Sequence, residues 1–371
     1  KYREDNKRRL KIISKEELRK QGVVSPDAFD CYDKETEVLT KKGFKLFKDV
    51  IKDDLIATLN SKEELEYQKP TKIIRQDYSG EMFEIKNRQV DLLVTPNHKL
   101  YVNTGDERFG KFKLKTAEEI KGMPYTLKKN CKWVGIEKKY FYLPSINEKK
   151  NKFARKYKKE KVRIKMDDWL EFLGYYLSEG WSGQNRVVVA QKVGTKTWGK
   201  MRDCFDRLGL NCKNYNCDKN LFVFQNRQLM VYLKRFGKSY QKFIPEEIKE
   251  LSSRQLRILF NALMDGDGCR SQYWTVSKLL RDDMIEIALK IGLSASWYIK
   301  HKKGKEWFHR DGRARKAKYD LYGLIFSGYV GLKNGLTPTI NHHKKWGVRD
   351  KWVKYVGKIY CVTVPNHIIY V

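Results

Sequence analysis

Short apolar runs separated by glycine, asparagine and aspartate fill the chain from about residue 31 to residue 145. They read TEVLT, DLIATL, EMFEIK, DLLVTP and HKLYV. Short strands bounded by turn residues are typical of an all-β unit. The last residues of the sequence, KIYCVTVPNHIIYV, return to the same pattern. We therefore predict an all-β unit that takes strands from both of these parts.

Between these two parts, apolar residues recur at helical spacing. DDWLEFLGYYLSEGW predicts a helix capped by Asp167 or Asp168, and SSRQLRILFNALMDGDGC predicts another capped by Ser252 or Ser253. The first is followed by strands in RVVVAQK and LFVFQ and a helix in RQLMVYLKRFG. The second is followed by a strand in YWTVS, a helix in KLLRDDMIEIALKIG and strands in ASWYIKH and YDLYGLIFS. The pattern predicts an imperfect duplication over residues 166–345, of helix–strand–strand–helix type, inserted into the β unit.

Length and composition narrow the class of protein. At 371 residues the chain has room for two or three domains, and 41% hydrophobic residues is typical of globular proteins. It has no apolar run of about 18 residues, so we expect no membrane span. The sequence starts with charged residues and lacks an apolar leader. Seven scattered cysteines, an odd number, do not resemble a disulfide framework. We predict a reduced, cytoplasmic protein.

Charge changes the picture further. The formal net charge is +33, which favours a polyanionic partner. A general excess of lysine is the alternative, but here basic residues form runs interleaved with aromatics, at 149–165 and 300–319. Such runs suit contacts to phosphates and bases. The predicted DNA contacts are Lys152, Arg155, Lys158, Lys300, Lys302, Arg313 and Arg315.

The two duplicated helices end alike, in FLGYYLSEG and FNALMDGDG. Superposing them matches Gly174 with Ala262 and Glu179 with Asp267. Small residues at matched positions predict a close contact between the helices, which places the two acids side by side. Paired carboxylates repel unless a cation neutralises them, and a divalent metal there can support phosphodiester hydrolysis. The alternative is two ordinary helices with solvated acids beside C-terminal glycines.

These segments resemble the two halves of a LAGLIDADG homing endonuclease fused in one chain, over roughly 150–345. The resemblance implies two αββαββα halves, β-ribbons in the major groove of double-stranded DNA, and Mg²⁺-dependent cleavage by a monomer. Glu179 and Asp267 correspond to the family's metal-binding acids. Lys242, in SYQKFIPEEI, corresponds to a basic residue near the scissile phosphate, and equal spacing in the second half reaches Lys344. A Glu in place of one Asp leaves open whether both strands are cut equally.

A second set of residues points to chemistry in the β unit. Cys31 opens it, and Thr95 and His98 lie three apart in TPNH. A buried structural cysteine is the usual alternative. A cysteine thiol can attack the carbonyl before it, that of Asp30, if the amide is polarised and its nitrogen protonated, and a Thr and a His on one turn can do this.

This ordered set resembles the Hint domain of inteins, over roughly 31–145 and 346–371. The closing segment YCVTVPNHIIYV then makes Cys361 and His367 the candidates at the second splice junction. Cys361 stands where many inteins have Asp, which implies a thiol role in ordering the steps. The family's terminal Asn and the Ser, Thr or Cys after it are not in the sequence, which ends at Val371. The chain is therefore expected to form the N-terminal thioester without completing splicing.

Together the resemblances imply an α+β multidomain protein. An all-β Hint horseshoe, residues 31–145 and 346–371, is split by a pseudo-symmetric αββαββα endonuclease at 146–345. Residues 1–30 are then host sequence. Their segment SPDAFD resembles the end of a phage terminase large subunit, with Asp30 as a metal-binding acid there. The leading hypothesis is an intein with an active DNA endonuclease. The alternatives are an intein whose endonuclease part is inactive and only binds DNA or RNA, and a group I intron maturase.

Overall fold

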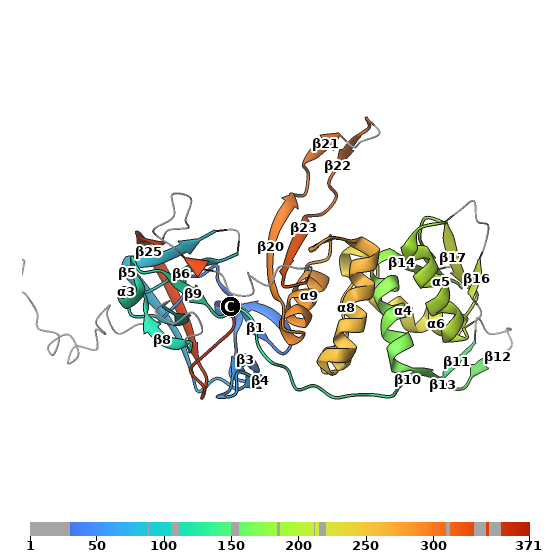
Figure 1. Ribbon diagram of the computed structural model, residues 1–371, viewed down its shortest axis with the longest axis horizontal. Coiled ribbons are helices and arrows are strands. Elements are labelled where there is room, and N and C mark those ends of the chain that lie inside the picture. The colour runs from blue at the N-terminus through green and yellow to red at the C-terminus, as the bar shows by residue number, and fades with distance from the viewer. Residues whose placement is uncertain are drawn as a thin grey trace, which may run out of the picture.

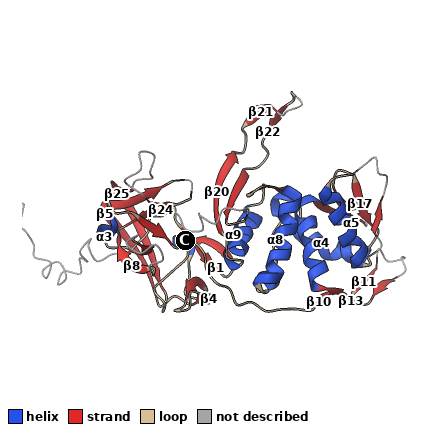
Figure 2. Cartoon of the chain, viewed as in Figure 1, coloured by secondary structure: helices blue, strands red, loops and turns tan. Residues whose placement is uncertain are grey.

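The chain folds as a mixture of helices and many small sheets, which confirms the predicted α+β class. The structure is a computed structural model, and it describes residues 30–87, 89–104, 111–149, 156–183, 186–210, 212–214, 220–308, 312–329, 339–340 and 350–371. Figure 1 shows one end of the molecule built almost entirely of strands and the other built of helices together with small sheets. Figure 2 separates the two by colour.

The strand-rich end, which we call the β unit, contains three sheets. Their orders are β2-β1-β3-β4, β24-β9-β7-β8 and β25-β5-β6. The strands are β1 (Glu37–Thr40), β2 (Gly43–Leu46), β3 (Ile56–Leu59), β4 (Leu65–Gln68), β5 (Lys72–Lys86), β6 (Asp91–Val94), β7 (Lys99–Asn103), β8 (Lys113–Thr116), β9 (Tyr125–Leu127), β24 (Thr339–Ile340) and β25 (Asp350–Thr363). The short helix α3 (Ala117–Ile120) begins with a capping box at Thr116.

The longest pairing in the β unit joins segments far apart in the sequence. β25 runs antiparallel to β5 over its whole length, from Asp350 opposite Ile85 to Thr363 opposite Lys72. The last strand thus completes a sheet begun by the first part of the chain, as the pattern of KIYCVTVPNHIIYV predicted. A core of alternating apolar residues, among them Tyr32, Phe83, Tyr360 and Val362, closes this unit.

The helix-rich end, which we call the α/β unit, has two halves of similar order. The first half contains α4 (Met166–Glu179), β14 (Gly180–Gly183), β15 (Arg186–Ala190), α5 (Lys196–Leu208), β16 (Cys212–Asn214), β17 (Leu221–Phe224), α6 (Arg227–Leu233) and α7 (Glu246–Lys249). The second contains α8 (Ser253–Asp267), β18 (Gly268–Cys269), β19 (Gln272–Thr275), α9 (Lys278–Lys290), β20 (Ser294–His301), β21 (Glu306–Phe308), β22 (Ala314–Lys316) and β23 (Leu321–Ser327). The pairs β10 (Tyr140–Leu143) with β13 (Val162–Lys165), and β11 (Ile146–Lys149) with β12 (Lys156–Lys159), precede α4.

The two four-stranded sheets of the α/β unit share one topology. Their orders are β14-β15-β17-β16 and β18-β19-β23-β20, so in each the last strand in sequence lies between the second and the third. The helix α5, between β15 and β16, is absent from the sequence prediction. Gly199 near its start and its polar surface obscured it, although Thr195 caps its start and Gly209 ends it with φ 64°.

One predicted helix start is wrong. α4 begins at Met166 after Lys165, which makes no side-chain cap, and Asp167 and Asp168 lie in the first turn. Asp167 instead binds Arg254, and negative charge in a first turn still complements the helix dipole. The other prediction is confirmed, because the hydroxyl of Ser252 accepts the N–H of Gln255 at the start of α8. No helix within the described ranges is both long and apolar enough to cross a membrane.

Candidate functional site

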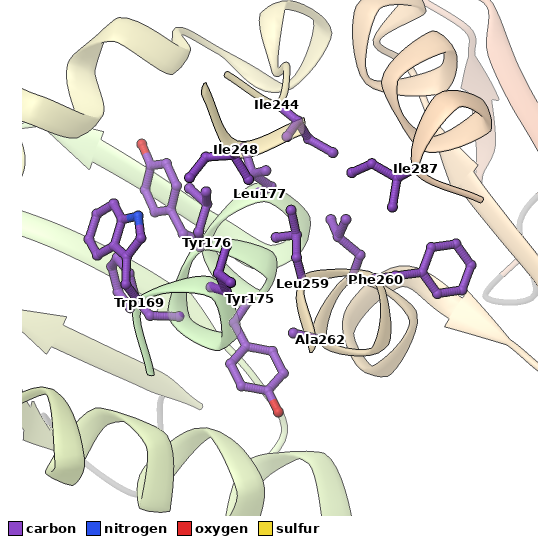
Figure 3. Packing of buried hydrophobic residues seen from close by; sticks show 14 of the residues in the cluster. Trp169, Tyr175, Tyr176, Leu177, Ile244, Ile248, Leu259, Phe260, Ala262 and Ile287 are labelled. Carbon is purple, nitrogen blue, oxygen red and sulfur yellow. The ribbon is translucent and has the colours of Figure 1, made fainter. Parts of the chain in front are cut away.

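The helices α4 and α8 approach each other at the small residues that the sequence matched. A Cβ added to Gly174 would lie 2.5 Å from Ala262 Cβ, and one added to Gly266 would lie 2.5 Å from Ser178 Cβ. Figure 3 shows Ala262 facing the α4 side chains across this contact. Large aromatic residues, including Trp169 and Tyr176, fill the space around the pair. The predicted close packing of these helices is therefore confirmed.

The C-terminal ends of α4 and α8 carry the two candidate acids. Burial, together with the negative charge of Glu179, raises the pKa of Asp267 to about 7. Burial also raises the pKa of Glu179. Two carboxylates in one poorly solvated place are costly to ionise together. A divalent cation fits this pair, because it would relieve both the repulsion and the loss of solvation.

Lys242 lies beside the same helix end but points inward. Its ammonium group donates to the carbonyls of Tyr176 at 3.2 Å and Gly180 at 2.9 Å, and lies 3.7 Å from the centre of the Tyr176 ring. Burial lowers the pKa of Lys242 to about 7. In this position Lys242 holds the end of α4 that carries Glu179. Tyr176, which sequence reasoning missed, completes the site for the amine. Lys344 lies outside the described residues.

The predicted DNA contacts that the structure describes are all exposed. Lys158 lies 3.1 Å from Glu160, and Lys300 lies over the ring of Trp274 at 4.6 Å. Lys302, Arg313 and Arg315 are exposed near the hairpin β21–β22, which projects away from the helices in Figure 1. Lys152 and Arg155 lie outside the described residues. The structure therefore leaves these side chains exposed on the surface of the α/β unit.

In the β unit, the backbone around Cys31 is held by Thr95. The N–H of Thr95 donates to the carbonyl of Cys31 at 3.0 Å, as in an antiparallel strand pair. The return bond goes elsewhere, because the carbonyl of Thr95 accepts the N–H of His98 in a turn. The N–H of Cys31 donates instead to the Thr95 hydroxyl at 3.0 Å. A side-chain hydroxyl thus contacts the nitrogen of the Asp30–Cys31 peptide bond.

His98 contacts the residues on either side of Cys31. Its Nδ1 is in contact with the carboxylate of Asp30, and its ring packs against Tyr32 with the centroids 4.3 Å apart. Burial of Asp30 raises its pKa, but the hydrogen bond and charge of His98 outweigh this and leave the pKa lowered. Thr95 and His98 are both buried; Thr95 contacts Cys31, whereas His98 contacts Asp30 and Tyr32.

Cys361 meets Cys31 in the same small apolar cluster. The hydrogen bond with Cys31 and burial raise the pKa of the Cys361 thiol, so it is protonated at neutral pH. His367 occupies a turn like that of His98, since its N–H donates to the carbonyl of Val364 at 3.0 Å. It differs in having a left-handed backbone, with φ 57°. Asp30, Cys361 and His367 all line a cavity of about 1500 Å³.

No family model matches this sequence. Among curated proteins, the chain is 28% identical over 398 residues to the C-terminal section of the RNA polymerase β subunit of Stigeoclonium helveticum, covering 92% of this chain and 35% of that protein. It is 28% identical over 296 residues to the Clp protease proteolytic subunit of Chlamydomonas moewusii, covering 72% and 28%. It is 29% identical over 120 residues to the ribonucleotide reductase β subunit of Aquifex aeolicus, covering 32% and 15%. The chain thus spans about a third of the length of the first two relatives or less.

Similar solved structures include an endonuclease and inteins. A variant of I-DmoI, a LAGLIDADG homing endonuclease solved with its nicked target DNA in the presence of manganese, has 15% identity and a TM-score of 0.31, covering 44% of this chain and 89% of that one. The AceL NrdHF class 3 split intein has 18% identity and a TM-score of 0.22, covering 37% and 78%. The Ssp DnaB mini-intein has 15% identity and a TM-score of 0.22, covering 36% and 78%. Since TM-scores this low carry no weight, the function has to be inferred from the residues of this chain.

Proposed function

We propose that the chain is an intein: an autoprocessing element, the β unit, that carries a DNA endonuclease, the α/β unit, as an insert. The observation that carries the first part is that Thr95 contacts the peptide nitrogen of the Asp30–Cys31 bond while His98 contacts the side chain of Asp30. The carbonyl carbon of Asp30 is the point of attack.

In the proposed reaction the Cys31 sulfur attacks the Asp30 carbonyl carbon. A carbon–sulfur bond forms, the carbon–nitrogen bond breaks, and the proton released by the thiol reaches the departing nitrogen by way of His98. Thr95 keeps that nitrogen oriented throughout. The product is a thioester that joins residues 1–30 to Cys31. Residues 1–30 are then the host segment; the similarity of residues 1–29 to a terminase lies outside the described part of the chain.

The curated relatives support an insert that moves between hosts. A polymerase subunit, a protease subunit and a reductase subunit are named for unrelated functions, yet each matches part of this chain. The longest match covers 92% of the chain and so includes both the β unit and the α/β unit. A segment shared by unrelated proteins is expected of an element that is inserted into them.

The observation that carries the endonuclease part is the pair Glu179 and Asp267. Their half-buried, mutually repelling carboxylates would hold a divalent cation such as Mg²⁺, with water and DNA phosphates completing its ligands. The bound cation would supply a more acidic water and charge neutralisation at the phosphate. Lys242 would fix the end of α4, and the exposed basic residues of the α/β unit would bind the backbone of double-stranded DNA.

Autoprocessing is tested by adding a thiol to the purified full chain. We expect release of residues 1–30, detected by mass spectrometry, and no release from a Cys31→Ala variant. Equal release by the two proteins would show that no thioester forms at Cys31.

DNA cleavage is tested with the uninterrupted host gene, which lacks the coding segment that starts at Cys31. With Mg²⁺ we expect a double-strand break near the junction and its loss in Glu179→Gln. Glu247→Gln, at an exposed carboxylate paired with Arg235, is the matched control and should cleave normally. If wild type and Glu179→Gln are equally inactive while both bind the DNA, the insert is a binding module.

A further inference from the structure

Two cysteines from opposite ends of the β unit face each other across one strand pair. Tyr32 and Tyr360 exchange both backbone hydrogen bonds, with the N–H of Tyr32 2.8 Å from the Tyr360 oxygen and the reverse pair at 2.9 Å. They are therefore a hydrogen-bonded antiparallel pair. The next residues along the two strands, Cys31 and Cys361, are directly opposite each other in the following, non-hydrogen-bonded position.

This position brings side chains closer than any other in an antiparallel pair. Opposite Cα atoms at non-hydrogen-bonded positions lie about 4.5 Å apart, inside the range of about 4.4–6.8 Å that disulfides span. Because side chains alternate along a strand, both cysteines point to the face opposite Tyr32 and Tyr360. The packing agrees, since the two tyrosines share one apolar cluster and the two cysteines share another. A bond between the sulfurs therefore needs side-chain rotation without a change in the backbone.

We propose that Cys31 and Cys361 form a reversible disulfide that blocks autoprocessing. The inference rests on the proposed function, because the sulfur that the disulfide removes is the one that attacks the Asp30 carbonyl. In the reduced protein the two are free thiols in contact. Oxidation therefore acts on the nucleophile itself and leaves Thr95 and His98 in place.

The oxidant is a small disulfide such as oxidised glutathione. Cys361 lines the cavity of about 1500 Å³, which gives such a molecule a route to its sulfur. A base in solution takes up the proton of the Cys361 thiol as its sulfur displaces one glutathione and forms a mixed disulfide, and the Cys31 sulfur then displaces the second. Both protein thiols lose their proton and together two electrons, and one oxidised glutathione becomes two reduced glutathiones. An excess of reduced glutathione reverses both steps.

The sequence carries a trace of this arrangement that its motifs did not reveal. The order Cys31–Tyr32 in one strand is reversed as Tyr360–Cys361 in the other. In an antiparallel pair this reversed order places tyrosine opposite tyrosine and cysteine opposite cysteine. Among the residues that the structure describes, Cys131, Cys204 and Cys212 are also free and share no such pairing with another cysteine. The exposed Cys269 can form bridges between molecules, so the test uses a Cys269→Ser background.

The experiment separates oxidation from thiol-induced release. The full chain is treated with oxidised glutathione, and one portion is alkylated and mapped by mass spectrometry without reduction. In a second portion, which is not alkylated, release of residues 1–30 is started with hydroxylamine, which cleaves thioesters but leaves disulfides intact. We expect a peptide that links Cys31 to Cys361 and at least a tenfold slower release, restored by a phosphine reductant. Within a Cys361→Ser variant, whatever its own rate, oxidised and untreated protein should release equally.

Each result decides the proposal. If oxidised protein contains no Cys31–Cys361 peptide, or contains it and releases residues 1–30 at the reduced rate, the redox block is refuted. If the linked peptide forms but reduced wild type also releases nothing, the proposed autoprocessing fails and with it the block, while the disulfide remains. Oxidant sensitivity that persists in Cys361→Ser would place the reactive partner elsewhere and also refute the assignment.

Discussion

Replacing Gly174 by alanine would force α4 and α8 apart at their closest contact. The new Cβ would lie 2.5 Å from Ala262 Cβ, 2.9 Å from the Leu259 carbonyl oxygen and 3.0 Å from the Leu263 nitrogen. Carbon atoms in contact lie about 3.5–4.0 Å apart, so the helices must separate by about 1 Å. Overpacking of this kind costs about 1–3 kcal/mol, and alanine returns about 0.5–1 kcal/mol of helix propensity. We expect a net loss of up to about 2.5 kcal/mol, whereas a glycine with room for a Cβ would show a gain.

Gly199 is the matched control for this substitution. It also lies within a helix, α5, but a Cβ there would meet nothing within 4 Å. Gly199→Ala should therefore stabilise the protein by about 0.5–1 kcal/mol. The assay is urea unfolding followed by circular dichroism, and the two variants should shift the midpoint in opposite directions. The double variant Gly174→Ala with Ala262→Gly should lose less than the sum of the single changes. Equal shifts for Gly174→Ala and Gly199→Ala would refute the close packing of α4 on α8.

Three further predictions concern buried polar groups. Asp267 has a folded-state pKa raised to about 7, so between pH 4 and 7 the folded protein binds a proton that the unfolded chain has lost. The free energy of unfolding should therefore fall as the pH rises from 4 to 7, by at most about 4 kcal/mol. Thermal melting should show a flatter pH profile for Asp267→Asn than for the wild type. Thr95→Val leaves the N–H of Cys31 without its acceptor and should slow hydroxylamine release by about tenfold or more. Thr58→Val, at a buried hydroxyl that lines the same cavity, leaves the hydrogen bond of the Cys31 N–H intact and should leave the rate unchanged. Lys249→Met strips two buried carboxylates of a cation at 2.8 and 3.0 Å and should cost about 3–5 kcal/mol of unfolding free energy; a loss below about 1 kcal/mol would show that this network is solvated.

Local signals in the sequence were sufficient for several parts of the site. The matched small residues Gly174 and Ala262 gave the contact between α4 and α8, because a helix face is set by residue spacing alone. Ser252 gave the start of α8, because a capping serine lies within three residues of the N–H that it accepts. TPNH gave the turn that carries Thr95 and His98, since the turn lies within four residues.

Other features depend on partners that no local pattern specifies. The burial of Lys242 requires the end of α4, which lies more than 60 residues upstream. The contact of Cys31 with Cys361 requires β25 to return to the start of the β unit. α5 was missed because a glycine near its start weakens the helical signal, while the packing of Met201 and Phe205 stabilises it in the fold.

The pairing of β24 with β9 bears on the order in which the protein folds. β9 ends at Leu127 and β24 begins at Thr339, so neighbouring strands are joined by a loop of roughly 210 residues. Closing an unstructured loop of that length costs about 5 kcal/mol of chain entropy. If the α/β unit folds first, with its own core, its compact body spans most of that length and brings the two strands together. The β unit would then assemble last, so Cys31 meets Thr95 and Cys361 only after the whole insert has been made and folded.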